Sequence, residues 1–267
     1  KILIDKDMLD NASQLKFVAR LGSGLDIIDL DYAAKKGVQV FRAAAGNANA
    51  VAEQALGMLL CLASNIHIAD KEVRQFEWNR ESNRGWEIKD KTIGVVGFGN
   101  TGSRFAQKLA GFGVNVKAYD KYKEHFADDI RYVSEVKDMS DLLSCDILSF
   151  HIPLTKETEH LVNGAFLQKC KPGAIIINTS RGQIVDTNAL VLALESGELG
   201  GACLDVFECE KPELMDEAQK GLYSKLYAMN NVVLTPHIAG WTQESKQAIA
   251  DILMSQIRSL DRNGQEA

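Results

Sequence analysis

The sequence predicts an α/β fold built around a doubly wound parallel sheet, and two observations carry this prediction. The first is the run Gly97-Phe98-Gly99-Asn100-Thr101-Gly102, which follows an apolar strand-like segment at 91–96 and precedes a helical pattern at 101–109. The second is a continued alternation of short apolar runs with helical segments further along the chain. Because parallel strands are joined by crossover helices, this alternation favours a parallel sheet over an antiparallel one.

The remaining elements follow in chain order. Strands are predicted at 17–19, 114–119, 130–133, 146–151, 174–178, 202–207 and 232–234, and helices at 31–36, 140–143, 163–170, 186–196 and 242–260. Upstream of the glycine run, apolar residues recur at helical spacing from Val51, and charges take over from Asp70. This pattern predicts one long helix over 49–80.

The two ends of the chain are expected to form one domain together. Residues 1–45 are too few to bury a core by themselves, so they need a packing partner. The final predicted helix supplies one. We therefore expect a discontinuous domain made of residues 1–45 and 241–267, with a second domain, residues 46–240, inserted between its parts.

The glycine run, between its strand and its helix, has the context of a dinucleotide-binding fingerprint in a Rossmann sheet. Gly97 and Gly99 let the backbone turn tightly and approach a pyrophosphate, and Gly102 lets the helix pack close to the strand. Asn100 and Thr101 open the helix, whose N-terminus presents free N–H groups to phosphate oxygens.

Asp120 ends the next predicted strand and indicates which dinucleotide binds. An acid at this place, about 20 residues past the fingerprint, accepts hydrogen bonds from the adenosine ribose and repels the extra phosphate of NADP. Lys121 and Lys123 are the residues that would instead attract that phosphate. With the acid in place, NAD is the expected cofactor.

Composition argues against several classes of function. The chain has 267 residues, 46% of them hydrophobic, and a net charge of −6 with lysines interspersed among acids, which argues against nucleic acid or an anionic membrane as a partner. Its longest apolar stretch, 55–63, is too short to span a membrane, and its first residues lack the apolar core of a secretion signal. Five cysteines without a C-x-x-C pair suggest neither a disulfide framework nor a metal site. We expect a cytoplasmic protein that binds small molecules.

Three segments at predicted strand ends carry ionisable residues: Asn178-Thr-Ser-Arg-Gly-Gln-Ile-Val-Asp186, Leu204-Asp-Val-Phe-Glu-Cys-Glu210 and Thr235-Pro-His-Ile-Ala-Gly240. Ligands of open α/β sheets bind beyond the carboxyl ends of the strands. With these segments, and with 20–26 and 46–53 upstream, the sequence resembles the D-isomer-specific 2-hydroxyacid dehydrogenases over nearly its whole length. The resemblance implies a Rossmann domain inserted into a smaller, flavodoxin-like substrate domain, whose first strands are expected to be missing here.

The resemblance also implies that Arg181, Glu210 and His237 form the catalytic set of an enzyme that interconverts a D-2-hydroxy acid and its 2-oxo acid. The planar fork of Arg181 suits a substrate carboxylate. Histidine is the side-chain type that exchanges protons near neutral pH, which suits His237 as acid and base. Glu210, five residues after Asp205, would orient the imidazole and favour its protonated form, with Glu208 as a competitor for that role.

Further contacts carry over from the same family. Toward the cofactor, the family implies Asp205 at the nicotinamide carboxamide, and His151, Pro153, Thr179, Ser180 and Gly240 along the sheet edge. For His151, a structural hydrogen bond at the strand end is an equally weighted alternative. Toward the substrate, it implies Arg20, Gly22, Ser23, Gly24 and Asn47 together with Arg181.

The sequence leaves the substrate open between D-3-phosphoglycerate, as in serine biosynthesis, and glyoxylate or hydroxypyruvate. A non-catalytic NAD-sensing protein, like the corepressors that resemble this family, is the alternative from another class. A short-chain dehydrogenase is disfavoured, because Tyr119 and Lys123 straddle a strand end and do not lie on a later helix. The apolar helix after Gly46 and the family's habit predict a homodimer.

Overall fold

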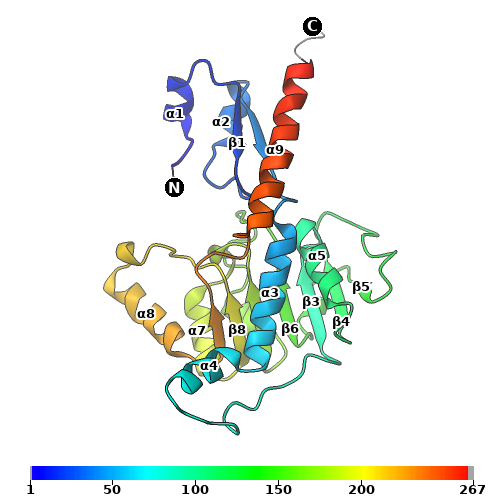
Figure 1. Ribbon diagram of the computed structural model, residues 1–267, viewed down its shortest axis with the longest axis vertical. Coiled ribbons are helices and arrows are strands. Elements are labelled where there is room, and N and C mark those ends of the chain that lie inside the picture. The colour runs from blue at the N-terminus through cyan, green and yellow to red at the C-terminus, as the bar shows by residue number, and fades with distance from the viewer. Residues whose placement is uncertain (1, 264–267) are drawn as a thin grey trace. The chain divides into compact units, whose positions relative to one another are not determined.

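The computed structural model describes residues 2–263 and divides them into two compact units (Figure 1). The larger unit comprises residues 51–239, and the smaller unit comprises residues 2–50 together with 240–263. Sequence reasoning placed the corresponding boundaries at 45/46 and 240/241.

The larger unit is built on seven parallel strands in the order β5-β4-β3-β6-β7-β8-β9. These strands are β3 (Thr92–Val96), β4 (Asn115–Tyr119), β5 (Val133–Glu135), β6 (Ile147–Phe150), β7 (Ala174–Asn178), β8 (Leu199–Leu204) and β9 (Val232–Leu234). The order runs outward in both directions from the central pair β3 and β6, so the chain reverses its direction of travel across the sheet there. The predicted doubly wound α/β fold is confirmed, and β3 and β6 flank its topological switch point.

Helices cover both faces of this sheet, and each face has its own core. On one face Ile93, Ile147 and Ile177 pack against α3 (Ala48–Ala63) and α5 (Asn100–Leu109). On the other face Leu148 and Ile176 pack against α6 (Gly164–Leu167), α7 (Thr187–Glu195) and α8 (Glu217–Ala228), and against the 3-10 turn η1 (Met139–Leu142). Successive residues of a strand point to opposite faces, which explains why these strands are apolar at nearly every position.

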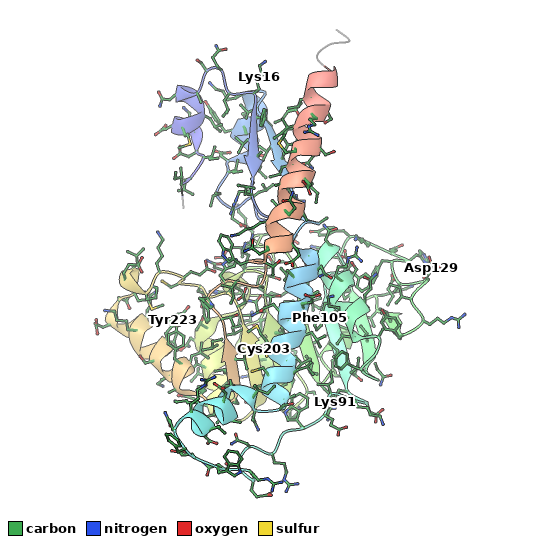
Figure 2. All side chains as sticks on the ribbon, viewed as in Figure 1. Lys16, Lys91, Phe105, Asp129, Cys203 and Tyr223 are labelled. Atoms are coloured by element: carbon green, nitrogen blue, oxygen red, sulfur yellow. The ribbon has the colours of Figure 1, made fainter. Side chains whose placement is uncertain are left out.

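Two side chains labelled in Figure 2 belong to the core of the larger unit. Phe105 of α5 and Cys203 of β8 both lie inside the body of the larger unit and are fully buried. All five cysteines are free thiols. Burial raises the pKa of Cys145 and of Cys170 to about 11, so these thiols stay protonated and unreactive at neutral pH.

The prediction of one helix over 49–80 is wrong. The structure has α3, then a break at Asn65, whose φ of 52° lies in the left-handed region, then α4 (Ile66–Arg74). The chain after α4 folds back, and the N–H of Trp86 donates to the carbonyl of Ala63 at 2.9 Å. This returning segment satisfies the end of α3, which removes the need for the helix to continue.

Strand β8 begins three residues earlier than predicted, with Leu199-Gly200-Gly201. Glycine weakens a strand pattern, so these residues were left out of the prediction. Here they are required, because a Cβ at Gly200 would lie 2.4 Å from the carbonyl oxygen of Gly173, and one at Gly201 would lie 2.5 Å from that of Asn231. Strand β5 was predicted three residues too early, and helix α8 was not predicted.

The smaller unit holds a two-stranded parallel sheet, β1 (Phe17–Arg20) and β2 (Gln39–Arg42), with helices α1 (Lys6–Asn11), α2 (Leu30–Lys35) and α9 (Gln243–Asn263). Helix α1 and strand β2 were missed from sequence. Ile249 and Leu253 of α9 pack with Ala43, so the two ends of the chain do share a core. A Cβ at Gly46 would lie 2.8 Å from the side chain of Ile249, which shows how closely α9 approaches.

No single helix among the described residues is long and apolar enough to cross a membrane. Helices α3 and α4 pass such a test of length and composition only when taken together, and they are bent by 64° at their junction.

Candidate active site

The glycine run forms a tight cradle between the end of β3 and the start of α5. Gly97 has a φ of +90°, and a Cβ there would lie 2.6 Å from the carbonyl oxygen of His151. A Cβ at Gly102 would lie 1.9 Å from the carbonyl oxygen of Gly97. Gly99 caps α5 without a side-chain hydrogen bond, so Asn100 and Thr101 begin a helix whose first N–H groups are left uncapped by that residue, as binding of an anion requires.

Asp120 lies against this cradle. Its Oδ2 accepts a hydrogen bond from the N–H of Phe98 at 2.8 Å, and its Oδ1 accepts one from the N–H of Tyr122 at 3.0 Å. Lys123 donates to the carbonyl of Phe98 at 2.9 Å, and Lys121 forms an ion pair with Glu157. Both lysines that would attract the extra phosphate of NADP therefore already have partners, while the acid that suits NAD is held in place.

The turn that carries Arg181 is braced by buried amide groups. The side chain of Asn178 donates to the carbonyl of Arg181 at 2.8 Å and accepts from the N–H of Ser180 at 3.0 Å. The hydroxyl of Ser180 donates to the carbonyl of Phe150 at 2.6 Å, which ties the turn to the end of β6. Arg181 is half-buried in extended backbone just before the 3-10 turn η2 (Gly182–Ile184).

His237 and Glu210 form a direct pair, with Nδ1 of the ring 2.6 Å from Oε1 of the carboxylate. The backbone of His237 is left-handed, with a φ of 57°, and its N–H donates to the carbonyl of Asp205 at 2.7 Å. The fully buried carboxylate of Asp205 accepts from the N–H groups of Ile238 and Ala239 at 2.9 and 2.8 Å. Asp205 therefore holds the loop that presents the histidine, and its role toward the nicotinamide stays a prediction.

The second acid of this segment has another partner. Oε1 of Glu208 lies 2.6 Å from Nε2 of His160, and Oε2 accepts from the N–H of Thr187 at 2.9 Å. The hydrogen bond to Glu208 raises the pKa of His160 above its ordinary value. The structure brings Glu210, the acid that the family pattern selected over Glu208, to His237. His160 lies outside every motif, and no signal in the sequence marked it.

His151 and Thr179 leave polar atoms unpaired at the ends of β6 and β7. Nε2 of His151 is 2.9 Å from the hydroxyl of Ser149, and desolvation of the partly buried ring lowers its pKa to about 3. Nδ1 of His151 and the hydroxyl of Thr179 are buried, and in the part of the chain that the structure describes they have no hydrogen-bond partner. Together with the glycine cradle, these orphaned atoms fit a bound dinucleotide. Pro153 lies on the same edge, and its carbonyl accepts from Thr158 at 2.7 Å.

Within residues 2–263 no group of three or more His, Cys, Asp or Glu side chains is arranged to hold a metal ion.

Apart from Arg181, the residues predicted to contact the substrate lie in the smaller unit, as does Gly240, whereas the predicted catalytic set lies in the larger unit. A Cβ at Gly240 would lie 2.6 Å from the amide nitrogen of Asn47, so these two residues are in contact. Arg20 bends back over its own loop: Nη1 donates to the carbonyl of Leu21 at 2.7 Å and the guanidinium covers Gly22. Ser23 and Gly24 follow in the same half-buried turn.

Comparison with known sequences supports the resemblance to the D-isomer-specific 2-hydroxyacid dehydrogenases. Residues 56–239 match the family model described as D-isomer specific 2-hydroxyacid dehydrogenase, NAD binding domain. A glyoxylate reductase of Thermococcus litoralis is 39% identical over 94% of this chain and 75% of its own length. A hydroxypyruvate reductase of Thermotoga maritima is 36% identical over 95% and 80%, and a D-3-phosphoglycerate dehydrogenase of Synechocystis is 39% identical over 96% and 45%.

Solved structures agree with the sequence comparison. D-lactate dehydrogenase from Aquifex aeolicus, complexed with NAD and lactic acid, superimposes with a TM-score of 0.88 at 31% identity, covering 98% of this chain and 81% of that one. D-2-hydroxyisocaproate dehydrogenase does so with a TM-score of 0.87 at 28% identity, covering 99% and 82%.

A family model that covers most of the chain, relatives aligned over nearly its whole length and a matching fold all agree with the glycine cradle, its acid and the paired histidine. The chain belongs to the D-isomer specific 2-hydroxyacid dehydrogenase family and is an NAD-dependent oxidoreductase that acts on the CH–OH group of 2-hydroxy acids.

Proposed function

We propose that this dehydrogenase interconverts a small D-2-hydroxy acid and its 2-oxo acid with Arg181, Glu210 and His237 as its working side chains. The observation that carries the proposal is the 2.6 Å contact between Nδ1 of His237 and Glu210. A ring held at one nitrogen has a fixed orientation, so its other nitrogen is available to exchange a proton with the substrate oxygen.

The three side chains divide the work by their chemistry. The guanidinium of Arg181 binds the substrate carboxylate, a planar match that a lysine does not reproduce. Nε2 of His237 takes the hydroxyl proton when the alcohol is oxidised and returns it when the ketone is reduced. Glu210 stabilises the protonated ring in between. NAD supplies the hydride acceptor for the hydrogen on the substrate's second carbon.

The cofactor lies, in this proposal, along the cradle and the strand ends. The N–H groups at the start of α5 bind its pyrophosphate, and Asp120 accepts from the adenosine ribose. The orphaned Nδ1 of His151 and hydroxyl of Thr179 supply further polar contacts along the sheet edge. Asp205 contributes indirectly, by fixing the loop of His237.

The names of the similar proteins support two substrate classes. D-3-phosphoglycerate is one, and glyoxylate or hydroxypyruvate is the other. We propose a test by NADH oxidation against four 2-oxo acids: phosphohydroxypyruvate, hydroxypyruvate, glyoxylate and pyruvate. A preference for phosphohydroxypyruvate supports D-3-phosphoglycerate as the substrate. A preference for glyoxylate or hydroxypyruvate supports the second class. Turnover of none of the four would contradict the proposal and favour an NAD-sensing role.

We also propose that the protein is a homodimer, although not for the reason that the sequence suggested. The apolar side chains of α3 are used inside the larger unit, where Ala52, Ala55 and Leu59 are completely buried. Exposed apolar side chains lie in the segment after α4, where Phe76 is 100% exposed and Trp78 is 77% exposed. Aromatic side chains are enriched at interfaces between protein chains.

The dimer is tested by mass in solution. We expect the wild type to sediment as a dimer at micromolar concentration and the double variant Phe76→Ser, Trp78→Ser to shift toward the monomer. Leu192→Ser, which changes a 56% exposed apolar residue on α7, is the matched control and should leave the mass unchanged. A monomeric wild type would contradict the proposal.

A further inference from the structure

Glu208 joins three backbone segments of the larger unit, which makes it the centre of a small polar cluster. Its Oε1 contacts Nε2 of His160 at 2.6 Å, and its Oε2 accepts from the N–H of Thr187 at 2.9 Å. Its carbonyl accepts from the side chain of Gln183 at 3.4 Å. We call Glu208, His160, Gln183 and Thr187 the Glu208 cluster. It binds the segment around 160, the segment 183–187 and the loop after β8 to one another.

The cluster fixes the segment that begins with Arg181. The N–H of His160 donates to the carbonyl of Gln183 at 2.7 Å, and the N–H of Val162 donates to that of Ile184 at 3.0 Å. Val162 and Val185 form an isolated parallel bridge. The segment after Arg181 is therefore held along its length by residues 160–162. The side chain of Glu208 holds the end of this segment at Thr187 and also contacts His160.

The same cluster fixes the loop that ends with Glu210. A Cβ at Gly182 would lie 1.9 Å from the carbonyl carbon of Phe207, so the backbone next to Arg181 rests directly on the backbone next to Glu208. On the other side, the N–H of Cys209 donates to the hydroxyl of Tyr223 at 3.1 Å. Tyr223 lies on α8 and is buried (Figure 2). Glu208 is thus the residue at which the two catalytic segments are joined.

The charge of His160 strengthens this join. The ring faces three acids, Glu208, Asp186 and Glu159, and the hydrogen bond to Glu208 favours its protonated form. A charge-assisted hydrogen bond is stronger and shorter than a neutral one. The backbone of His160 is left-handed, with a φ of 48°, so its conformation is maintained by these contacts.

We propose that Glu208 and His160 are positioning residues, which set the place of Arg181 relative to Glu210 and His237 without touching substrate or cofactor. This inference rests on the roles proposed above for Arg181 and Glu210. Since a misplacement of roughly 1 Å costs up to about 10²-fold in rate, loss of the cluster slows catalysis even though every catalytic side chain is retained.

The experiment compares two substitutions of His160 in the full chain. His160→Leu removes the donor to Glu208, whereas His160→Gln keeps an N–H donor of similar reach. Steady-state kinetics use the 2-oxo acid turned over fastest among the four named above, at saturating NADH. For His160→Leu we expect kcat/KM to fall by about 10- to 100-fold, with a higher KM for the 2-oxo acid, a lower kcat and an unchanged Kd for NADH. His160→Gln should keep most of the wild-type kcat/KM.

His125→Leu is the matched control. His125 has a left-handed backbone, with a φ of 57°, and an acid partner, Asp128, at 3.3 Å, and it contacts neither catalytic segment. We expect its kinetics to equal those of the wild type. A purely structural role for His160 predicts lower melting temperatures in both His160 variants with wild-type kcat and KM, and this result would overturn the inference.

Arg181→Lys separates failure of this inference from failure of the proposed function. If it leaves the KM for the 2-oxo acid unchanged, the proposed role of Arg181 is wrong and the basis of the inference is lost. If Arg181→Lys raises that KM while His160→Leu does not, the function stands and the positioning role alone is refuted. Bound NADH fluorescence confirms that each variant is folded.

Discussion

The larger unit contains two histidine–glutamate pairs, whose acids, Glu208 and Glu210, lie near each other in the sequence and whose histidines use opposite ring nitrogens. His237 contacts Glu210 through Nδ1, and His160 contacts Glu208 through Nε2, each at 2.6 Å. Both histidines have left-handed backbones, and both rings are roughly half exposed. The pairs are nearly equivalent as chemistry, so what distinguishes them is where each ring is held.

The backbone around each histidine decides its use. The loop of His237 is fixed by the buried carboxylate of Asp205, so the ring is presented from a rigid support. The backbone of His160 is fixed instead by Gln183, which belongs to the segment that begins with Arg181. One pair is therefore suited to exchange a proton, and the other to hold two segments in register.

His237→Ala is the strongest test of this contrast. We expect turnover to fall by about 10²- to 10⁴-fold, the usual contribution of a general acid and base, while NADH binding stays nearly intact. Steady-state kinetics and NADH titration measure the two quantities. If His160→Ala lowered turnover as much as His237→Ala did, the distinction between the two pairs would be wrong.

Replacing the acid of each pair by glutamine is expected to have the next largest effect. Glu210→Gln replaces a charged partner of His237 by a neutral one, and we expect kcat/KM to fall by about 10- to 100-fold, which is the range for loss of a charged hydrogen bond. Glu208→Gln should lower it less, because that residue touches neither reactant. Parallel kinetics on the two variants rank them, and the reverse order would exchange the roles of the two acids.

His151, partly buried and neutral, supplies a third case and predicts a pH dependence of stability. Its folded pKa of about 3 lies below the ordinary value of 6.5, so between these values the unfolded chain binds the extra proton. Stability is therefore lost as pH falls below 6.5, by about 1.4 kcal/mol per pH unit from this residue. Urea unfolding of the wild type and of His151→Asn at pH 7 and pH 5 should show a smaller pH effect in the variant. Equal slopes would contradict the partly buried, neutral state.

The smallest expected effect is the pH dependence of stability that comes from His160, which is opposite in direction to that from His151. The pKa of His160 is raised above 6.5, so its pair with Glu208 stabilises the fold fully below that pH, and this contribution disappears as pH rises through the folded pKa. The contribution is less than about 1 kcal/mol, because the ring is nearly half exposed to solvent. The difference in unfolding free energy between wild type and His160→Leu should shrink from pH 6 to pH 9. A constant difference would show that the charge contributes nothing.

The sheet was largely predictable from sequence, because buried parallel strands are apolar at successive positions and the glycine run fixes one of their ends. The errors fell where a distant part of the chain decides the local structure. Asn65 ends α3 because Trp86 returns to its last carbonyl, and Gly200 and Gly201 belong to β8 because other backbones approach them closely. Neither contact is visible in a local pattern.

The site residues and the pairing of Glu210 with His237 were predicted from the family resemblance, whereas the contacts that support this pair were not. The family pattern, with its acid five residues after Asp205, selected Glu210, but the partner of Glu208 was found only in the structure, since His160 is far away in sequence. The part of Asp205 in holding the loop of His237 was missed for the same reason. Contacts between side chains on different loops depend on the whole fold, so local patterns in a single sequence do not predict them.

The central place of β3 bears on how the larger unit folds. β3 pairs with β4, the next strand along the chain, and with β6, which follows much later. Every pair in this sheet is parallel, so no strand pair forms from a tight turn, and proteins rich in such non-local pairing fold slowly. Closing the shorter loop costs less entropy, so we expect β3 and β4 to pair before β6 joins. Because Gly97 rests on the carbonyl of His151 just after β6, the cofactor cradle is completed only at this later step.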